Sequence, residues 1–63
     1  MVYVLIGYDE DYYTFETFIG VFSTKEKAQE CRDNDYGIIN GKRYNNHSWY
    51  EIYEMIIDKP FSV

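Results

Sequence analysis

The stretch Ile19-Gly20-Val21-Phe22-Ser23-Thr24-Lys25-Glu26-Lys27-Ala28 decides the fold, because an aromatic and β-branched run changes there into a helical pattern. A run of such residues is typical of a strand, and apolar residues three and four apart are typical of a helix. Ser23 and Glu26 have the spacing of a capping box, in which each side chain bonds the backbone amide of the other residue. We therefore expect a strand that ends at Phe22 and a helix that begins at Thr24.

The predicted helix has a narrow apolar stripe. Thr24, Ala28 and Cys31 recur at the i, i+4, i+7 spacing, and all three side chains are small. A stripe of small residues lets a helix axis lie close to a sheet. The turn-forming residues Asp33-Asn34-Asp35, with Gly37 shortly after them, predict where the helix ends.

Two strands are expected before the helix. Residues Val2 to Tyr8 form an almost continuous apolar run, which is typical of a central strand that is covered on both faces. The charged turn Asp9-Glu10-Asp11 separates it from a second strand over residues 12–22, so that the two form a hairpin. Strict alternation along this second strand would place Glu16, Phe18, Gly20 and Phe22 on one face and Phe15, Thr17, Ile19 and Val21 on the other. Gly20 in the strand interior indicates a bulge or a close approach of another backbone.

After the helix, Asn40-Gly41 lies between two short runs in residues 37–44, which predicts a small hairpin with a type I′ turn. Residues 49–58 predict the last main strand, and Pro60 ends it. A right-handed crossover through the helix then places the last strand beside the first. The sequence thus predicts one α+β domain over residues 1–63, of ββαβ topology, with a mainly antiparallel three-stranded sheet in the order 2-1-3, one helix on one face and a small Asn-Gly hairpin.

One helix covers one face of such a sheet, so the other face should keep aromatic side chains, among them Tyr3, Phe18 and Tyr53. A chain of 63 residues buries only about 60% of the surface that it exposes when unfolded. Cys31 is the one cysteine, so an internal disulfide cannot add stability. We therefore expect a homodimer or higher homo-oligomer, with these three aromatic residues in the self-association surface.

The charge of the chain favours a basic protein as partner. Eleven Asp and Glu against six Lys and Arg give a formal net charge of -5, which disfavours direct binding of nucleic acid. We expect a partner-binding surface at an acidic and aromatic hairpin tip and at an aromatic anchor on the last strand: Asp9, Glu10, Asp11, Tyr12, Tyr13 and Trp49. An ordinary solvated turn and a core position for the tryptophan are the open alternatives.

The residues do not indicate catalytic, cofactor or metal chemistry. His47 is the one histidine and is expected in a loop, Cys31 is expected to be buried, and the four glycines are too scattered for a phosphate-binding loop. Three consecutive acids at 9–11 lack the spacing of a calcium loop. The first apolar run ends at Gly7, far short of the roughly 20 residues of a membrane span, and no basic leader precedes it, so we expect a cytoplasmic protein without membrane contact.

Three segments carry a resemblance: Val2 to Leu5, Gly20 to Ala28 and Tyr50 to Glu54. They resemble short ββαβ proteins of bacteria and their phages, in which the second segment joins a hairpin to a helix. Most members have no assigned function, so the resemblance implies a fold and carries no catalytic residue with it. In such proteins the Asn-Gly excursion varies.

Taken together, these features predict a non-enzymatic, acidic protein-interaction module. We expect a phage- or prophage-encoded inhibitor or modulator of a host protein that handles nucleic acid or serves in defence, located in the host cytoplasm. One alternative is a binder of, or an enzyme for, a nucleotide or other small-molecule signal that acts at an oligomer interface. Another is a structural accessory protein.

Overall fold

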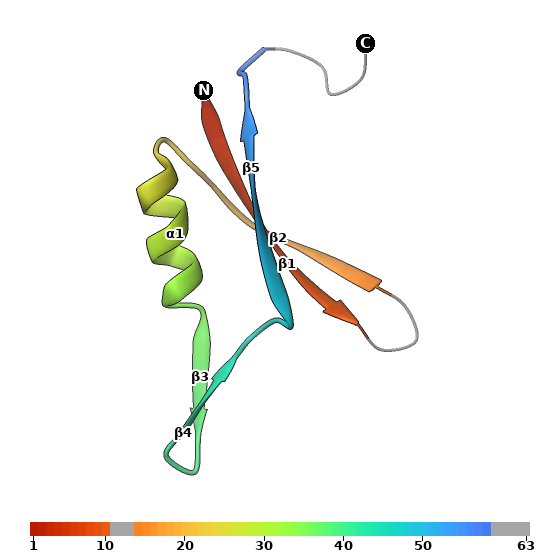
Figure 1. The fold of residues 1–63 in the computed structure, drawn as a ribbon, viewed down its shortest axis with the longest axis vertical. Coiled ribbons are helices and arrows are strands. Elements are labelled where there is room, and N and C mark those ends of the chain that lie inside the picture. The colour runs from red at the N-terminus through yellow and green to blue at the C-terminus, as the bar shows by residue number, and fades with distance from the viewer. Residues whose placement is uncertain (11–13, 59–63) are drawn as a thin grey trace.

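The structure is a computed structural model and describes residues 1–10 and 14–58. It contains one helix and five strands, in the chain order β1 (Val2–Glu10), β2 (Thr14–Phe22), α1 (Lys25–Asp33), β3 (Tyr36–Ile39), β4 (Lys42–Asn45) and β5 (Trp49–Met55). Three strands form an antiparallel sheet in the order β2-β1-β5, and α1 lies on one face of it (Figure 1). The predicted α+β class and strand order are confirmed. No helix of the described residues is long and apolar enough to cross a membrane.

The central strand is β1, as its continuous apolar run predicts. It pairs with β2 along one edge and with β5 along the other, and α1 packs across all three strands. Among the described residues, the buried apolar side chains are Val4, Leu5, Tyr8 and Ala28. Three of these four belong to β1. Alternation places Leu5 on the helix side, like Ala28 of α1, and places Val4 and Tyr8 on the other side, so the buried side chains lie on both faces of the central strand.

A bulge in β2 changes which side chains share a face. Leu5 pairs with Gly20 and Ile6 pairs with Phe18, so Ile19 is an extra residue in the ladder. The bulge predicted near Gly20 is confirmed, but the single alternation predicted along the whole strand is wrong. Val21 lies on the same side as Phe18, because the extra residue reverses the alternation between them.

The helix begins one residue later than predicted. Thr24 has extended backbone angles (φ -134°, ψ 154°) and is the N-cap, where its hydroxyl accepts from the backbone N–H of Lys27 at 3.2 Å. The expected capping box at Ser23 is therefore wrong, and its hydroxyl instead accepts from Lys27 Nζ at 3.4 Å. Of the predicted apolar stripe, Ala28 is buried, Cys31 is half-buried and the capping threonine is exposed.

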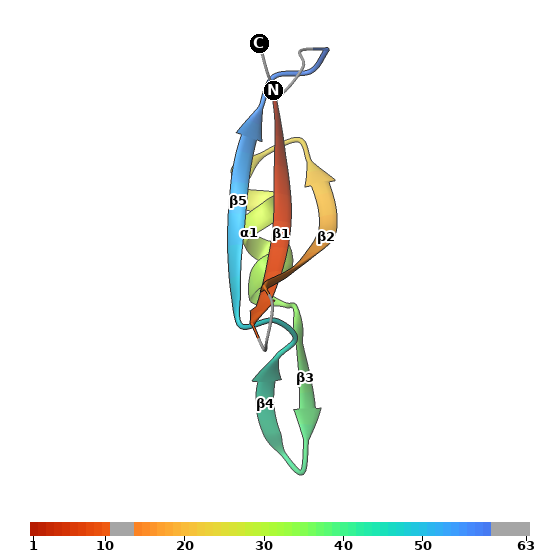
Figure 2. The same ribbon diagram turned by 90° about the vertical axis from the view of Figure 1, so that its right-hand side faces the viewer.

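Strands β3 and β4 form a two-stranded ribbon outside the main sheet. Its turn has positive φ at both Asn40 (51°) and Gly41 (77°), which is the signature of a type I′ turn and confirms the predicted hairpin. The ribbon follows directly from α1 and continues beyond the end of the three-stranded sheet (Figure 2). This excursion gives the molecule an elongated outline.

Candidate interaction surface

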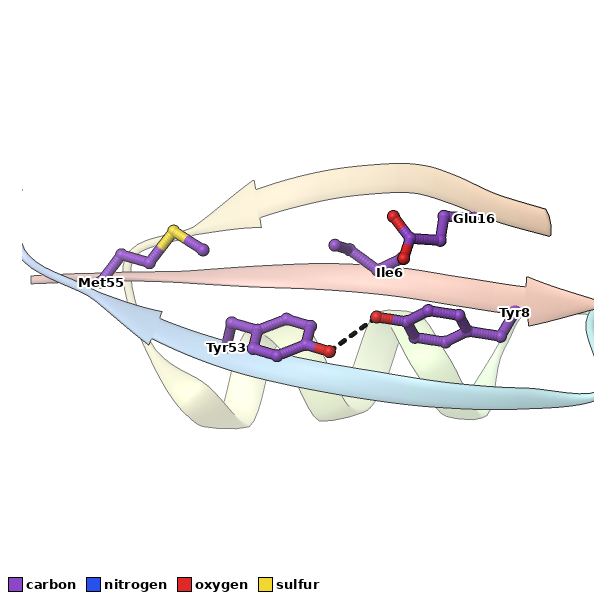
Figure 3. A pocket seen from close by; sticks show the side chains of 5 residues that line it. All are labelled: Ile6, Tyr8, Glu16, Tyr53 and Met55. Carbon is purple, nitrogen blue, oxygen red and sulfur yellow. Dashed lines mark hydrogen bonds between the residues drawn. The ribbon is translucent and has the colours of Figure 1, made fainter. Parts of the chain in front are cut away.

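The side of the sheet that α1 leaves uncovered is the candidate functional surface, and we call it the open face. Figure 3 shows side chains of all three strands on this side, with the helix behind the sheet. Besides the pair Glu10 and Thr14 at the ends of β1 and β2, strand register and alternation assign it eleven side chains: Val2, Val4, Ile6 and Tyr8 of β1, Glu16, Phe18 and Val21 of β2, and Trp49, Glu51, Tyr53 and Met55 of β5. Nine of the eleven are apolar or aromatic, and the other two are acidic.

Much of this apolar surface is accessible. Phe18 is 63% exposed and Val21 is 52% exposed, while Tyr53 and Trp49 keep about two-fifths of their surface in solvent. Contiguous exposed apolar side chains on one face are typical of a surface that meets a partner.

A shallow depression of about 330 Å³ lies at the centre of the open face, lined by Ile6, Tyr8, Glu16, Tyr53 and Met55 (Figure 3). Its walls come from all three strands, so the pairing of the sheet forms it. Four of the five lining side chains are apolar or aromatic, and one carboxylate lies at its side. The depression therefore suits an apolar side chain that carries, or neighbours, a positive charge.

Three aromatic side chains of the open face contact one another. The ring of Tyr8 stacks on Trp49, with ring centroids 5.4 Å apart and planes 8° from parallel. The hydroxyls of Tyr8 and Tyr53 are 2.6 Å apart and share a hydrogen bond. This bond, together with desolvation, raises the pKa of Tyr8 to about 12. The aromatic rings are thus held in fixed positions in the folded chain, which lowers the entropic cost of binding on them.

The charges of the open face have one sign. Glu16 pairs with Tyr8 across β1 and β2, and Glu51 lies on the same side of β5. Both carboxylates act on the Tyr8 hydroxyl and contribute to its raised pKa. None of the six Lys and Arg residues of the chain lies in β1, β2 or β5. The face therefore combines aromatic rings with negative potential.

A second group of side chains lies at the end of the sheet, on the helix side, and we call Asp9, Asp35, His47 and Tyr50 the His47 cluster. His47 Nδ1 is 2.6 Å from Asp9 Oδ2, and its Nε2 is 3.8 Å from Asp35 Oδ2. The Tyr50 hydroxyl donates to Asp35 Oδ2 at 2.7 Å and accepts from the His47 N–H at 3.2 Å. An ionised carboxylate only accepts hydrogen bonds, so Nδ1 carries a proton in its contact with Asp9.

The surroundings of the cluster shift two pKa values. Hydrogen bonds from Asn46 and Tyr50 hold the pKa of Asp35 below its usual value. Burial and the hydrogen bond to Asp35 raise the pKa of Tyr50 to about 12. Asp35 is thus held as a carboxylate and Tyr50 as a neutral phenol, which is the pair of states that their hydrogen bond requires.

Gly7 makes room for the histidine. A Cβ at this position would lie 2.5 Å from Cδ2 and Cγ of His47, so the ring packs directly on the backbone of β1. The His47 cluster joins two strands, β1 and β5, and two links, one between α1 and β3 and one between β4 and β5. Its hydrogen bonds hold the base of the ribbon against the sheet. Within residues 1–10 and 14–58, no group of three or more His, Cys, Asp or Glu is arranged to hold a metal ion.

The predicted partner-binding residues lie in different places. Asp9 belongs to the His47 cluster, where it also accepts from the Ser48 N–H at 3.2 Å, and Glu10 is exposed at the end of β1. The predictions for Asp11, Tyr12 and Tyr13 lie outside the described residues. Trp49 is on the open face, and its role as an anchor stays a prediction.

The predicted self-association residues divide between the two sides. Phe18 and Tyr53 lie on the open face. Tyr3 lies on the helix side of β1, because it alternates with Val4 and pairs with Phe22 and Glu54. Its predicted place on the uncovered face is therefore wrong. The part that these residues have in self-association stays a prediction.

Sequence reasoning did not group Asp35, His47 and Tyr50. They come from two links and a strand, and no spacing rule connects them. The one local indication is Gly7, whose missing side chain leaves the space that the His47 ring occupies. A glycine inside an otherwise continuous apolar strand indicates such a close approach, but it does not say which residue approaches.

A family model described as a domain of unknown function, DUF7336, matches residues 1–60 of this chain. The match covers nearly all of the 63 residues, so the protein belongs to this family. Neither the curated proteins nor the solved structures gave a match. The family description assigns no activity.

Proposed function

We propose that this member of the DUF7336 family is a small protein-interaction module whose open face binds a basic segment of a partner protein. The observation that carries the proposal is the composition of that face. It exposes aromatic rings and two carboxylates, and its three strands contain no Lys or Arg. An aromatic surface with negative potential is complementary to an apolar segment that bears positive charge.

The chemistry of recognition follows from the geometry. The aliphatic stem of a Lys or Arg can lie along the ring of Tyr53 or Phe18, and its charged end can reach Glu16 or Glu51. A cation over an aromatic ring gains about 0.5–2 kcal/mol, and more as water is excluded. The net charge of -5 adds long-range attraction, which raises the association rate at low salt.

The partner that fits this chemistry best is a protein with a basic surface for nucleic acid. An acidic module that covers such a surface competes with phosphates for the same cations. The proposal therefore includes inhibition or modulation of a nucleic-acid-handling or defence protein of a bacterial host. It also includes a phage or prophage origin and a place in the host cytoplasm.

The test compares two charge reversals on the same strand. Glu51 lies on the open face of β5 and Glu54 lies on its other side, and both are exposed. Tagged wild-type protein, Glu51→Lys and Glu54→Lys are used to capture proteins from bacterial lysate, and a captured protein is then purified and titrated at several salt concentrations. We expect Glu51→Lys to weaken binding about tenfold or more, and Glu54→Lys to bind nearly as the wild type does.

The titration also gives the salt dependence, which should be steep for the wild type and shallower for Glu51→Lys. Recovery of no protein other than the bait counts against the proposal. An equal loss of binding in Glu51→Lys and Glu54→Lys also counts against the proposal, because it would show that binding does not depend on the open face in particular.

A further inference from the structure

The ribbon of β3 and β4 exposes apolar side chains that nothing in its own fold covers. Ile38 is 67% exposed and Ile39 is 62% exposed, next to the turn at the far end of the ribbon. An isolated two-stranded hairpin is marginally stable in water, and packing against another element stabilises it. The ribbon therefore has the properties of an arm that packs on another surface.

The two faces of the ribbon differ in their contacts with the rest of the chain. On one face, Arg43 lies over the ring of Tyr36 at 3.9 Å from its centroid and donates through Nη2 to Asp33 O at 2.7 Å. The other face carries Ile39, Lys42 and Tyr44, which alternation places together. We call these three residues the arm face. Ile39 and Tyr44 are at least half exposed, and Lys42 has no ion pair within the described residues.

The arm face and the open face are complementary in charge and in polarity. The arm face presents one branched apolar side chain, one cation and one aromatic ring. The open face presents a depression of about 330 Å³ with apolar and aromatic walls, and carboxylates at Glu16 and Glu51. Ile39 suits the depression, and Lys42 suits the carboxylates beside it.

Within one chain these two surfaces do not meet. The ribbon follows α1 on the helix side and continues past the end of the sheet in both views, away from the open face (Figures 1 and 2). The His47 cluster fixes the base of the ribbon there, through the contact of His47 with Asp9 and the bond from the Ser48 N–H to Tyr8 O at 2.9 Å. The open face can therefore contact an arm face only if that arm face belongs to a second copy of the chain.

The size of the chain also fits an association of this kind. The radius of gyration is 13.6 Å, whereas a compact chain of 63 residues has about 11 Å. The accessible surface is 5181 Å² for a mass of 7.6 kDa, and a compact monomer of that mass exposes about 4,300 Å². The chain therefore exposes about 900 Å² more surface than a compact monomer of its mass does.

We infer that the arm face of one copy docks on the open face of a second copy, and that two copies exchange arms in a closed dimer. Each dimer then contains two equivalent contacts, as two-fold symmetry requires. The inference shares the open face with the proposed function and rests on that function's acidic and aromatic chemistry. In this arrangement the arm occupies the place of a basic partner segment, so self-association and partner binding compete.

The test measures mass by sedimentation equilibrium over a range of concentrations, with the purified full chain alone. We expect the wild type to approach about 15 kDa, twice the 7.6 kDa of one chain. Lys42→Glu on the arm, or Glu16→Lys with Glu51→Lys on the open face, should each weaken dimerisation about tenfold or more. The matched controls are Lys25→Glu on α1, and Glu30→Lys with Glu54→Lys, which change the charge equally and should leave the dimer intact.

Mixing the two interface variants gives the decisive result. In the mixture one contact has the wild-type charges and the other has both charges reversed, so the dimer should return although each variant alone is monomeric. Circular dichroism confirms that each variant is folded. A wild type that is monomeric at every concentration overturns the inference, as does a dimer that survives both reversals or a mixture of folded variants that stays monomeric.

The outcome is separable from that of the proposed function. The monomeric Lys42→Glu variant keeps its open face, and it should bind a captured basic partner at least as tightly as the wild type does. A monomeric wild type that binds the partner through Glu51 leaves the proposed function standing and removes only the exchange of arms.

Discussion

The two sides of β1 have opposite characters although one strand supplies both. On the helix side, Leu5 is fully buried and the hydrogen bonds of the His47 cluster join two strands and two links of the chain. On the open face, Phe18 is 63% exposed and the main polar contact is a single bond between Tyr8 and Tyr53. The difference indicates a division of work. The helix side joins distant segments of the chain, whereas the open face, although Val4 and Tyr8 are buried in it, keeps Phe18 accessible for binding.

Each side also has a tyrosine hydroxyl in a defined hydrogen bond, which permits a direct comparison. The Tyr50 hydroxyl contacts the carboxylate and the carbonyl oxygen of Asp35 and the backbone N–H of His47. The Tyr53 hydroxyl contacts only Tyr8 among the described residues. Substitutions at matched positions on the two sides therefore test directly whether the two sides differ in their contribution to stability.

The largest effect is expected from removing a core side chain. Leu5→Ala should lower the free energy of unfolding by about 2–5 kcal/mol, because it leaves a cavity beneath the helix. A core of this size supplies only about 3–5 kcal/mol, so the variant should be largely unfolded. Phe18→Ala should change stability by less than about 0.5 kcal/mol. Urea unfolding followed by circular dichroism checks both, and similar losses in the two variants would contradict the division between the sides.

The next effect compares two hydroxyls. Tyr50→Phe should cost about 1–3 kcal/mol, because Asp35 and the His47 N–H lose a partner in a half-buried place. Tyr53→Phe should cost less than about 1 kcal/mol, since water can replace its hydroxyl on the open face. Thermal unfolding of both variants provides the measurement. If Tyr53→Phe were the more harmful change, the open face would be part of the stabilising framework.

The smallest effect is the pH dependence of stability. The pKa values of Tyr8 and Tyr50 are raised to about 12 in the folded chain, above the ordinary value of about 10. Their contribution is fully present below pH ~10 and is lost as the pH rises toward about 12. The lowered pKa of Asp35 acts in the opposite direction, so its contribution is lost as the pH falls below about 4.

Unfolding midpoints measured between neutral pH and the alkaline limit check this expectation. Tyr53→Phe should bring the pKa of Tyr8 back toward its ordinary value, because the bond to Tyr53 is the largest cause of the shift. Tyrosinate absorbance follows that titration directly. An unchanged alkaline titration in Tyr53→Phe would show that the 2.6 Å bond does not control Tyr8.

Much of the fold was predictable from local patterns. The apolar run of β1 indicates a central strand, Asn40-Gly41 indicates the type I′ turn, and the change of period after Phe22 indicates the start of a helix. The prediction of the cap failed by one residue, because Ser23 and Thr24 are both good N-caps and only the backbone angles distinguish them. The predicted alternation in β2 was wrong because Gly20 indicates a bulge or a close approach without saying which residue is the extra one in the ladder.

The two functional surfaces were predictable to different degrees. An aromatic face without a covering helix follows from the count of elements, and Phe18 and Tyr53 were correctly placed on it. The His47 cluster was not predictable, since its Nδ1 contact joins residues 38 apart in the chain. Asp9 shows the consequence. Asp9 was expected to contact a partner from a hairpin tip. In the structure its carboxylate instead contacts His47 Nδ1 and accepts from the Ser48 N–H.

The elements and their order follow from the amino-acid sequence alone, because strand period, helix capping and turn type depend on residues a few positions apart. The sequence also shows that the chain is acidic and rich in aromatic residues. Only the folded chain shows which side chains share a face and which acids accept hydrogen bonds from distant residues. These properties depend on register, on one extra residue in a ladder and on contacts between distant segments. Each of them is fixed only when the strands pair and the helix packs.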